Sequence, residues 1–545
     1  MRQSLIAAAG ITTLALISFF QFPGHTWLQQ DSQIYAPILE HLRDPEALKN
    51  DILVRRPHVS FTLYDESALA LRKITGWEFQ GCLQLEQLVT RALGIWGVWL
   101  IATALGLELM PALLVAAIFT LGATIAGPSV LTFEYEPVPR GLAVPLLLLA
   151  VGLAAHGRDL GAGIAGSVAF LIHPPTVYPF WGVYFLLTLC PSKPEVMRRR
   201  ILALAPLFAA VVTLLFASRL QAGVGETQVF FSRLEPLQEQ LQRMRAPYVW
   251  ISIWGRPWYG HYAVLYALCV LGYLRLRKAA PLDLRFFLAG LPLVGLLSMP
   301  VSYWLLEKMK WALLPQFQPL RALLFVTVTA VILCAVAGVK AASAGRLWEA
   351  VPWLVVPYLI PVNTRVTQIP PRNRLELIAV LVCAAAFSVR ALRWNKSAGN
   401  TLIVATALAA FFLIPGWGRV RNYPSLPSQP IEELAAWARA STPKDSVFLF
   451  PDAGRDIYPG IFRARALRAV YVDWKGGGQV NYLKELGEEW WARWQATMAR
   501  PYQPGNLTRY RRLGIDYLVV RPRNREPGVT PAFENSAFIV YRVPK

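Results

Sequence analysis

Long apolar runs are the feature that most restricts how this chain can fold. A helix needs about 20 mainly apolar residues to cross the hydrocarbon core of a bilayer, and a somewhat shorter run can span it with tilt or shared packing. Together the runs predict a mainly α polytopic membrane protein with about thirteen transmembrane helices. They lie near 5–20, 88–106, 111–126, 141–155, 162–173, 178–190, 201–217, 262–274, 286–301, 321–338, 349–361, 375–389 and 401–416.

The composition agrees with this interpretation. The 545 residues are 55% hydrophobic and only 16% charged, whereas a soluble chain carries about 25% charged residues. The net charge of +21 has a topological explanation, because Lys and Arg accumulate in short cytoplasmic loops. The densest basic clusters between runs, at 193–200, 275–285 and 390–396, fall on one side if the N-terminus is cytoplasmic. We therefore expect membrane lipids and no nucleic acid as partners.

The order of the runs predicts which segments face the outside. The first run is expected to stay as a helix, because bulky residues follow it where a signal peptide would be cleaved. Residues 21–87 then form a long first outer loop of a transmembrane domain, 1–416. Residues 417–545 form an extracytoplasmic domain. The predicted orientation depends on whether the two short runs on either side of His173 are separate spans. If they formed one span, the predicted side of every later segment would be reversed.

The tail, 417–545, differs in character from the rest. Residues 431–441 form an amphipathic helix pattern, and short β-branched and aromatic runs at 446–451, 468–474, 516–522 and 538–543 predict strands. A further helix is expected at 483–498. This pattern indicates a small α/β domain. Its 20 Lys and Arg against 12 Asp and Glu suit either a generic basic surface or attraction to anionic lipids or acidic glycans.

Asp31 is the first candidate catalytic residue. It lies shortly after the first apolar run, at the mouth of the membrane, and precedes an amphipathic segment, 32–42. A carboxylate there can act as a general base toward an acceptor hydroxyl, or as a metal ligand. It can also cap the following helix by accepting its first free N–H groups, and this role does not exclude catalysis.

Glu134 and Glu136 are further candidate catalytic residues, and they form a second acidic motif in the sequence FEYEPVPRG. Counting spans places them on the same side as Asp31. Together the three carboxylates would offer the oxygen ligands that Mg²⁺ or Mn²⁺ prefers, with Asp31 and Glu134 as the expected ligands. Alternatively, the glutamates favour the N-terminus of the next helix through its dipole, and Arg140 is a salt-bridge partner.

Arg140 and three further residues are candidates for binding substrate or phosphate. His173 stands beside two prolines that break an apolar run, which indicates either a cavity wall or a re-entrant turn. Arg321 begins an apolar run, and its planar guanidinium suits a phosphate, although snorkelling to the interface is an alternative. His58 lies in the polar first outer loop.

These features together resemble the GT-C superfamily of membrane glycosyltransferases. The resemblance implies transfer of a sugar from a polyprenyl-phosphate donor to a glycan, lipid or protein acceptor at the outer face of a bacterial-type plasma membrane. By its position, Asp31 corresponds to the acidic residue of the first loop, and Glu134 and Glu136 to the second acidic motif. A single Asp stands where many members carry two adjacent acidic residues, so metal dependence stays open, as does a catalytically silent scaffold.

A transporter or flippase of lipid-linked glycans is the alternative class. It would be expected to show ionisable groups near the middle of the membrane and internal repeats, and the sequence shows few such charges and no repeat. ATP-driven transport has no support, because the sequence holds no P-loop. No cysteine pattern indicates zinc or a disulfide framework.

Overall fold

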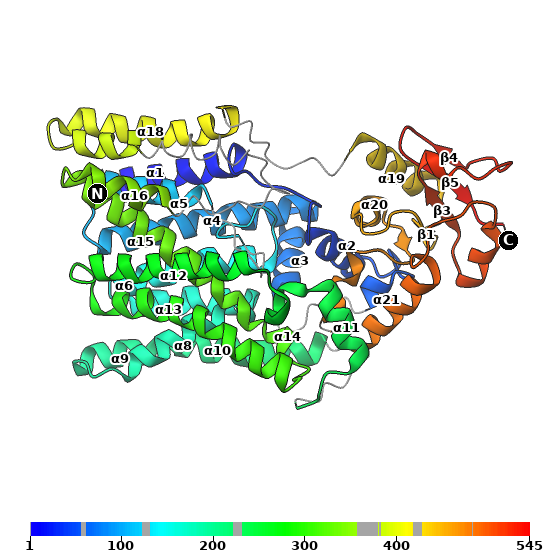
Figure 1. Cartoon of the computed structure of the whole chain (residues 1–545), viewed down its shortest axis with the longest axis horizontal. Coiled ribbons are helices and arrows are strands. Elements are labelled where there is room, and N and C mark those ends of the chain that lie inside the picture. Colours follow the sequence, from blue (N-terminus) through cyan, green and yellow to red (C-terminus); the bar gives the residue numbers. More distant parts are fainter. Residues whose placement is uncertain are drawn as a thin grey trace.

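The computed structural model of the protein describes residues 2–55, 62–122, 131–221, 231–356, 380, 383–417, 428–481 and 483–544. His58 lies outside these residues. A bundle of long helices occupies one end of the molecule, and the C-terminal domain occupies the other (Figure 1). Between them lie the polar helices α2 (Ser32–Arg43), α3 (Tyr64–Thr75) and α11 (Pro236–Arg245).

Apolar helices build the bundle, and the protein is a multi-pass membrane protein. Six helical stretches are long and apolar enough to cross a membrane, judged by length and composition, and three shorter apolar helices accompany them. The expected number of about thirteen spans stays a prediction, and the run at 375–389 lies partly outside the described residues. The bundle helices are α1 (Arg2–Phe20), α4 (Phe79–Ala104), α5 (Leu109–Thr120), α6 (Pro139–Ala155), α7 (Asp159–Ile172), α8 (Pro174–Leu189), α9 (Pro194–Leu202), α10 (Ala205–Gln221), α12 (Arg256–Leu276), α13 (Leu282–Ser302), α15 (Leu324–Ser343), α16 (Leu347–Val355) and α18 (Lys396–Trp417).

Close backbone packing holds the centre of the bundle together. Helices α4 and α6 cross where Gly97 faces the backbone of Leu148, and a Cβ added at Gly97 would lie 2.3 Å from the Leu148 carbonyl carbon. Small residues let membrane helices approach in this way. Helix α15 is buried along its whole apolar window, so it forms the core of the bundle.

The two runs around His173 are separate helices, as the sequence indicated. Tyr184, near the end of α8, donates a hydrogen bond to Asp159, at the start of α7, over 3.4 Å, so the two helices run antiparallel. At the His173 end, the Leu63 N–H donates to the carbonyl of Leu171 over 2.7 Å. His173 therefore lies at the end of the bundle that faces the outer-loop helices.

The C-terminal domain is the predicted small α/β unit. Its sheet has the order β2-β1-β3-β5-β4, parallel between β1 and its neighbours and antiparallel at β5. All four predicted strands and both predicted helices are present, and the short β4 is additional. The elements are α19 (Gln429–Ser441), β1 (Val447–Leu449), α20 (Tyr458–Ala466), β2 (Ala469–Val470), η7 (Gly476–Asn481), α21 (Lys484–Thr497), β3 (Tyr517–Val520), β4 (Phe533–Glu534) and β5 (Ile539–Arg542). The boundary expected at 416/417 stays a prediction, because 418–427 lie outside the described residues.

A buried ion-pair triad joins this domain to the first outer loop. Arg463 donates to Asp51 over 2.6 Å and also pairs with Asp473, and all three side chains are fully buried. Asp51 also accepts the Val470 N–H of β2 over 2.8 Å. Since buried charges are tolerated only when they are paired and hydrogen-bonded, this triad fixes how the domain sits on the loop.

We predict that Arg463→Met destabilises the domain strongly. Removing one partner of a buried pair leaves uncompensated charge and costs about 3–5 kcal/mol of unfolding free energy. The measurement is denaturant unfolding followed by tryptophan fluorescence. Arg465→Met, two residues further along α20 and paired with Glu432 at the exposed surface, is the control, with an expected loss of about 1 kcal/mol or less. Equal losses in both variants would contradict this role.

Candidate functional site

The acidic loop at 131–138 is held rigidly by buried donors from α3 and α4. Gln87 and Arg91 donate to the backbone carbonyl of Glu134 over 2.9 and 3.1 Å. Tyr64 donates its hydroxyl to the carbonyl of Pro137 over 2.6 Å. Each donor is buried, so the loop cannot exchange these bonds for water and its glutamates are fixed in position.

Glu136 uses its carboxylate to shape the turn that carries Asp31. It accepts the backbone N–H groups of Gln29 and Gln30 over 2.6 and 2.7 Å, and it also accepts both the N–H and the hydroxyl of Ser32. Burial raises the pKa of Glu136, and Asp31 raises it further, while these hydrogen bonds lower it. Glu136 is therefore engaged with the backbone, and its role in the described structure is to position Asp31.

Asp31 is clamped between two cations from different parts of the chain. Its carboxylate accepts from Arg140 Nη1 over 2.7 Å and from Lys475 Nζ over 2.5 Å. Burial alone would raise the pKa of Asp31, but Lys475 and Arg140 outweigh it and hold that pKa well below its ordinary value. The side chain is 26% exposed, so an ionised carboxylate reaches solvent at the junction of bundle and domain.

The helix-capping alternative for Asp31 is wrong. Although Asp31 occupies the position before α2, its side chain makes no capping hydrogen bond. Only its backbone carbonyl accepts from the helix, from Ile34 over 2.8 Å. The stronger attraction of two full charges has turned the carboxylate toward Arg140 and Lys475 instead.

Arg140 links the two acidic motifs that the sequence predicted to meet. In the first turn of α6, its Nε donates to Glu134 over 2.7 Å while Nη1 donates to Asp31. Arg140 is thus a salt-bridge partner of Glu134 and Asp31. Two carboxylates and two cations, from Asp31, Glu134, Arg140 and Lys475, form a charge-balanced cluster.

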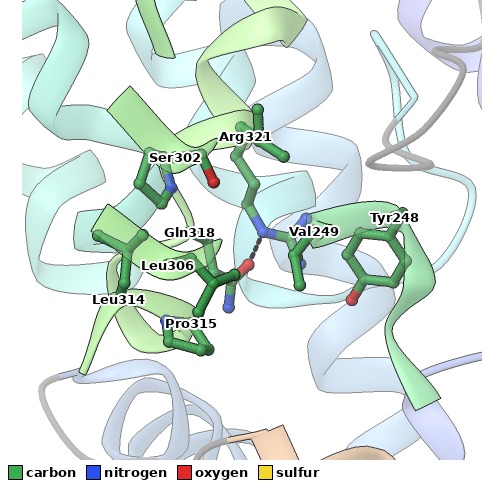
Figure 2. A pocket seen from close by; sticks show the side chains of 10 residues that line it. Tyr248, Val249, Ser302, Leu306, Leu314, Pro315, Gln318 and Arg321 are labelled. Carbon is green, nitrogen blue, oxygen red and sulfur yellow. Dashed lines mark hydrogen bonds between the residues drawn. The ribbon is translucent and has the colours of Figure 1, made fainter. Parts of the chain in front are cut away.

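Arg321 lies in a separate pocket at the same end of the bundle (Figure 2). The pocket is lined mainly by apolar side chains, together with Tyr248, Ser302 and Gln318. Arg321 is largely buried, and its Nε donates to Gln318; among the described residues no carboxylate forms an ion pair with it. Its guanidinium is therefore a buried positive charge available to an anion.

His173 lies at the same end of the bundle as the pocket and the Asp31 cluster. Its Nδ1 is 2.8 Å from the hydroxyl of Thr176, in the first turn of α8. The pocket, His173 and the cluster thus all lie at the end of the bundle covered by the C-terminal domain.

The carboxylates of the site are arranged in a way that does not suit a divalent cation. Both oxygens of Asp31 accept from cationic side chains, Glu134 accepts from Arg140, and Glu136 accepts from backbone N–H groups. Among the described residues, no three His, Cys, Asp or Glu side chains are grouped so as to hold a metal ion. A bound Mg²⁺ or Mn²⁺ would have to displace the protein's own cations, so these residues do not fit one as arranged.

Sequence reasoning found Asp31, Glu134, Arg140 and Arg321, and it missed Lys475. The signal available was the three-glycine turn that follows Trp474 and Lys475, which marks a place where backbone approaches other groups closely. Nothing in the local sequence points from that turn to Asp31, 444 residues away.

One protein-family model matches a part of the C-terminal domain. Residues 429–497 match a domain family of unknown function, DUF6798. Comparison with curated protein sequences found no match.

Three solved glycosyltransferases are similar over nearly the whole of this chain. ArnT from Cupriavidus metallidurans is 12% identical, with 98% of this chain and 97% of that chain covered and a TM-score of 0.45. The Archaeoglobus fulgidus oligosaccharyltransferase is 11% identical over 94% of this chain and 69% of its own, with a TM-score of 0.41. The mycobacterial arabinofuranosyltransferase AftD is 14% identical over 99% and 41%, with a TM-score of 0.46. The named neighbours include an oligosaccharyltransferase and an arabinofuranosyltransferase.

We predict that the stability contributed by Asp31 depends on pH. A carboxyl group whose pKa is lowered by folding stabilises the fold above its unfolded pKa, about 3.9, and loses that contribution as pH falls toward the folded pKa. The difference in Tm between wild type and Asp31→Asn should therefore be constant from pH 8 to about pH 5 and shrink below about pH 4. Thermal unfolding across this range measures it. A difference that already disappears near pH 6 would show that Lys475 and Arg140 do not hold the carboxyl ionised.

Proposed function

We propose that this chain is a membrane glycosyltransferase that moves a sugar from a polyprenyl-phosphate donor to an acceptor hydroxyl outside the cytoplasm. The observation that carries the proposal is a pair of features at the end of the bundle that faces the C-terminal domain. One is an ionised, partly exposed carboxylate, Asp31, and the other is a pocket with a buried Arg321 that forms no ion pair among the described residues. A glycosyl transfer from a phosphate needs both parts: an acceptor for the proton and a cation for the leaving group.

Arg321 is suited to bind the donor phosphate. Its guanidinium has parallel N–H donors that match phosphate oxygens, and the apolar walls strengthen the attraction. Helix α13, which contributes Ser302 to the pocket, exposes apolar side chains such as Leu293 and Leu297 on its outer surface. A polyprenyl chain in the bilayer would lie along this surface while its phosphate enters the pocket.

Asp31 is suited to receive the acceptor. Its carboxylate accepts a hydrogen bond from the hydroxyl and orients the oxygen toward the anomeric carbon. As the new bond between that oxygen and the anomeric carbon forms, the bond between carbon and phosphate oxygen breaks, and its electron pair leaves with the phosphate. The hydroxyl proton becomes strongly acidic only as this bond forms, so a weakly basic carboxylate such as Asp31 can take it late in the step.

We infer the side of the membrane on which the site lies from the distribution of Lys and Arg. In Figure 1 the N-terminus and α9 lie at the end of the bundle opposite the C-terminal domain. Arg275, in a second basic cluster, lies at the same end, because it pairs with Glu349 of α16 over 2.8 Å. Since Lys and Arg concentrate in cytoplasmic loops, this arrangement supports a site on the extracytoplasmic side of a bacterial-type plasma membrane.

The test is turnover by purified protein in liposomes with a panel of polyprenyl-phosphate sugars and candidate acceptors, followed as release of polyprenyl phosphate. Asp31→Asn should lower kcat by about 10²-fold or more while the Kd for the donor stays within about twofold, because only the proton acceptor is lost. Arg321→Met should raise the donor Kd by about tenfold or more, because a charged hydrogen bond is worth about 1.5–3 kcal/mol.

Arg346→Met is the matched control. This arginine follows the opposite end of α15 and is 53% exposed, so its loss should change neither quantity. Wild-type turnover in Asp31→Asn would remove Asp31 from the chemistry. Donor binding without turnover in the wild type, with every acceptor, would favour a catalytically silent scaffold.

A further inference from the structure

We propose that Lys475 of the C-terminal domain is a positioning residue that supplies, at Asp31, the positive charge a divalent cation would otherwise supply. This inference rests on the proposed function. It assigns the C-terminal domain a part in the reaction site itself, and it makes the transfer independent of added metal. The donor chemistry supports it, because Lys475 and Arg140 occupy both oxygens of Asp31.

The backbone on both sides of Lys475 is fixed by buried bonds. Asp473 pairs with Arg463 and accepts the Gly476 N–H over 3.1 Å, while its carbonyl accepts the Trp490 indole N–H over 2.9 Å. A Cβ at Gly477 would lie 2.4 Å from the Trp490 ring, so the turn packs too closely for a side chain there. The side chain of Lys475 therefore projects from a turn whose position is set by the buried triad of Asp51, Arg463 and Asp473. The same triad docks the C-terminal domain on the first outer loop.

Helix α11 also holds this turn in place, through Arg245. Arg245, at the end of α11, stacks on Trp474 with its guanidinium carbon 3.7 Å from the ring centroid, and its Nε donates to the carbonyl of Gly477 over 3.2 Å. Arg455 stacks on the same ring at 4.7 Å. Such stacking of Arg on Trp is favourable and restricts the ring, so Trp474 and its neighbour Lys475 have little freedom.

The charge balance of the site depends on Lys475. The groups that face Asp31 are Arg140 from α6, Glu136 from the acidic loop and Lys475, with Glu134 reached through Arg140. Without Lys475, the carboxylates Asp31 and Glu134 would share Arg140 alone. The resulting net negative charge would repel the phosphate on which negative charge accumulates during transfer.

The Lys475 ammonium group has more N–H donors than its bond to Asp31 uses. Lys475 is 14% exposed on its side chain and carries three N–H donors, of which Asp31 accepts one among the described residues. The same group can therefore hold Asp31 in its ionised form and lower the cost of the leaving phosphate.

The test compares Lys475→Met, Lys475→Arg and the control Lys444→Met by kcat and KM, with EDTA or added Mn²⁺. Lys444 also joins the C-terminal domain to the first loop, through an exposed pair with Asp44 over 3.9 Å. Lys475→Met should lower kcat by about 100-fold. Lys475→Arg should recover kcat to within about tenfold of wild type, because it restores the positive charge beside Asp31. Lys444→Met should match wild type, and EDTA should leave wild-type turnover unchanged.

A Lys475→Arg variant as slow as Lys475→Met, or a wild type that turns over only with added divalent cation, would overturn the inference. A double-mutant cycle of Tm with Asp31→Asn and Lys475→Met separates it from the proposed function, because it needs no substrate. Non-additive losses of Tm without turnover on any donor would overturn the transfer function alone. Additive losses would overturn the pairing with Lys475 whether or not sugar is transferred.

Discussion

The ion pairs around Asp31 are the interaction on which the rest of this structure depends. A carboxylate at the edge of an apolar bundle is unfavourable unless opposite charges approach it closely, and here they come from α6 and from the C-terminal domain. Each partner needs its own support. Arg140 is held by Glu134, whose backbone is held by Gln87 and Arg91. The acidic loop, the first outer turn and the C-terminal domain are thus parts of one arrangement.

This arrangement explains why a soluble domain covers the bundle. The fully buried triad of Asp51, Arg463 and Asp473 places the turn that carries Lys475 directly over the first outer loop. Docking and charge balance are therefore linked, because a displaced domain would leave Asp31 with Arg140 alone. Because the domain covers the mouth of the bundle, Asp31 is only partly exposed, and this partial removal from water strengthens its interactions with Arg140 and Lys475.

Much of this could be predicted from the sequence, for identifiable physical reasons. Asp31, Glu134 and Arg140 each stand next to an apolar run, and the ends of neighbouring membrane helices meet at one surface, so their proximity follows from counting spans. The strands of the C-terminal domain follow from β-branched runs between turn residues. The sequence presents Glu136 as a candidate for the same chemistry as Glu134, because the two carboxylates stand two residues apart on one short turn. Only the structure shows that backbone N–H groups and Ser32 occupy it.

The contacts that join the domains could not be predicted in the same way. Lys475 lies 444 residues from Asp31, and Arg463 lies 412 residues from Asp51, with no periodicity or spacing that relates them. Such pairs depend on how two folded units dock, which a single sequence does not encode in any local pattern. A buried Arg in an amphipathic helix and a Lys before three glycines look ordinary until the docked surface is known.

The proposed function requires that the Arg321 pocket and Asp31 form one reaction site. Cryo-electron microscopy of the protein in nanodiscs, with a non-transferable phosphonate analogue of a polyprenyl-phosphate sugar, would locate both groups relative to a bound donor. We expect the phosphonate to lie about 3 Å from the Arg321 guanidinium, with the anomeric carbon on the side of Asp31. A headgroup bound at the opposite end of the bundle, or with its sugar turned away from Asp31, would contradict it.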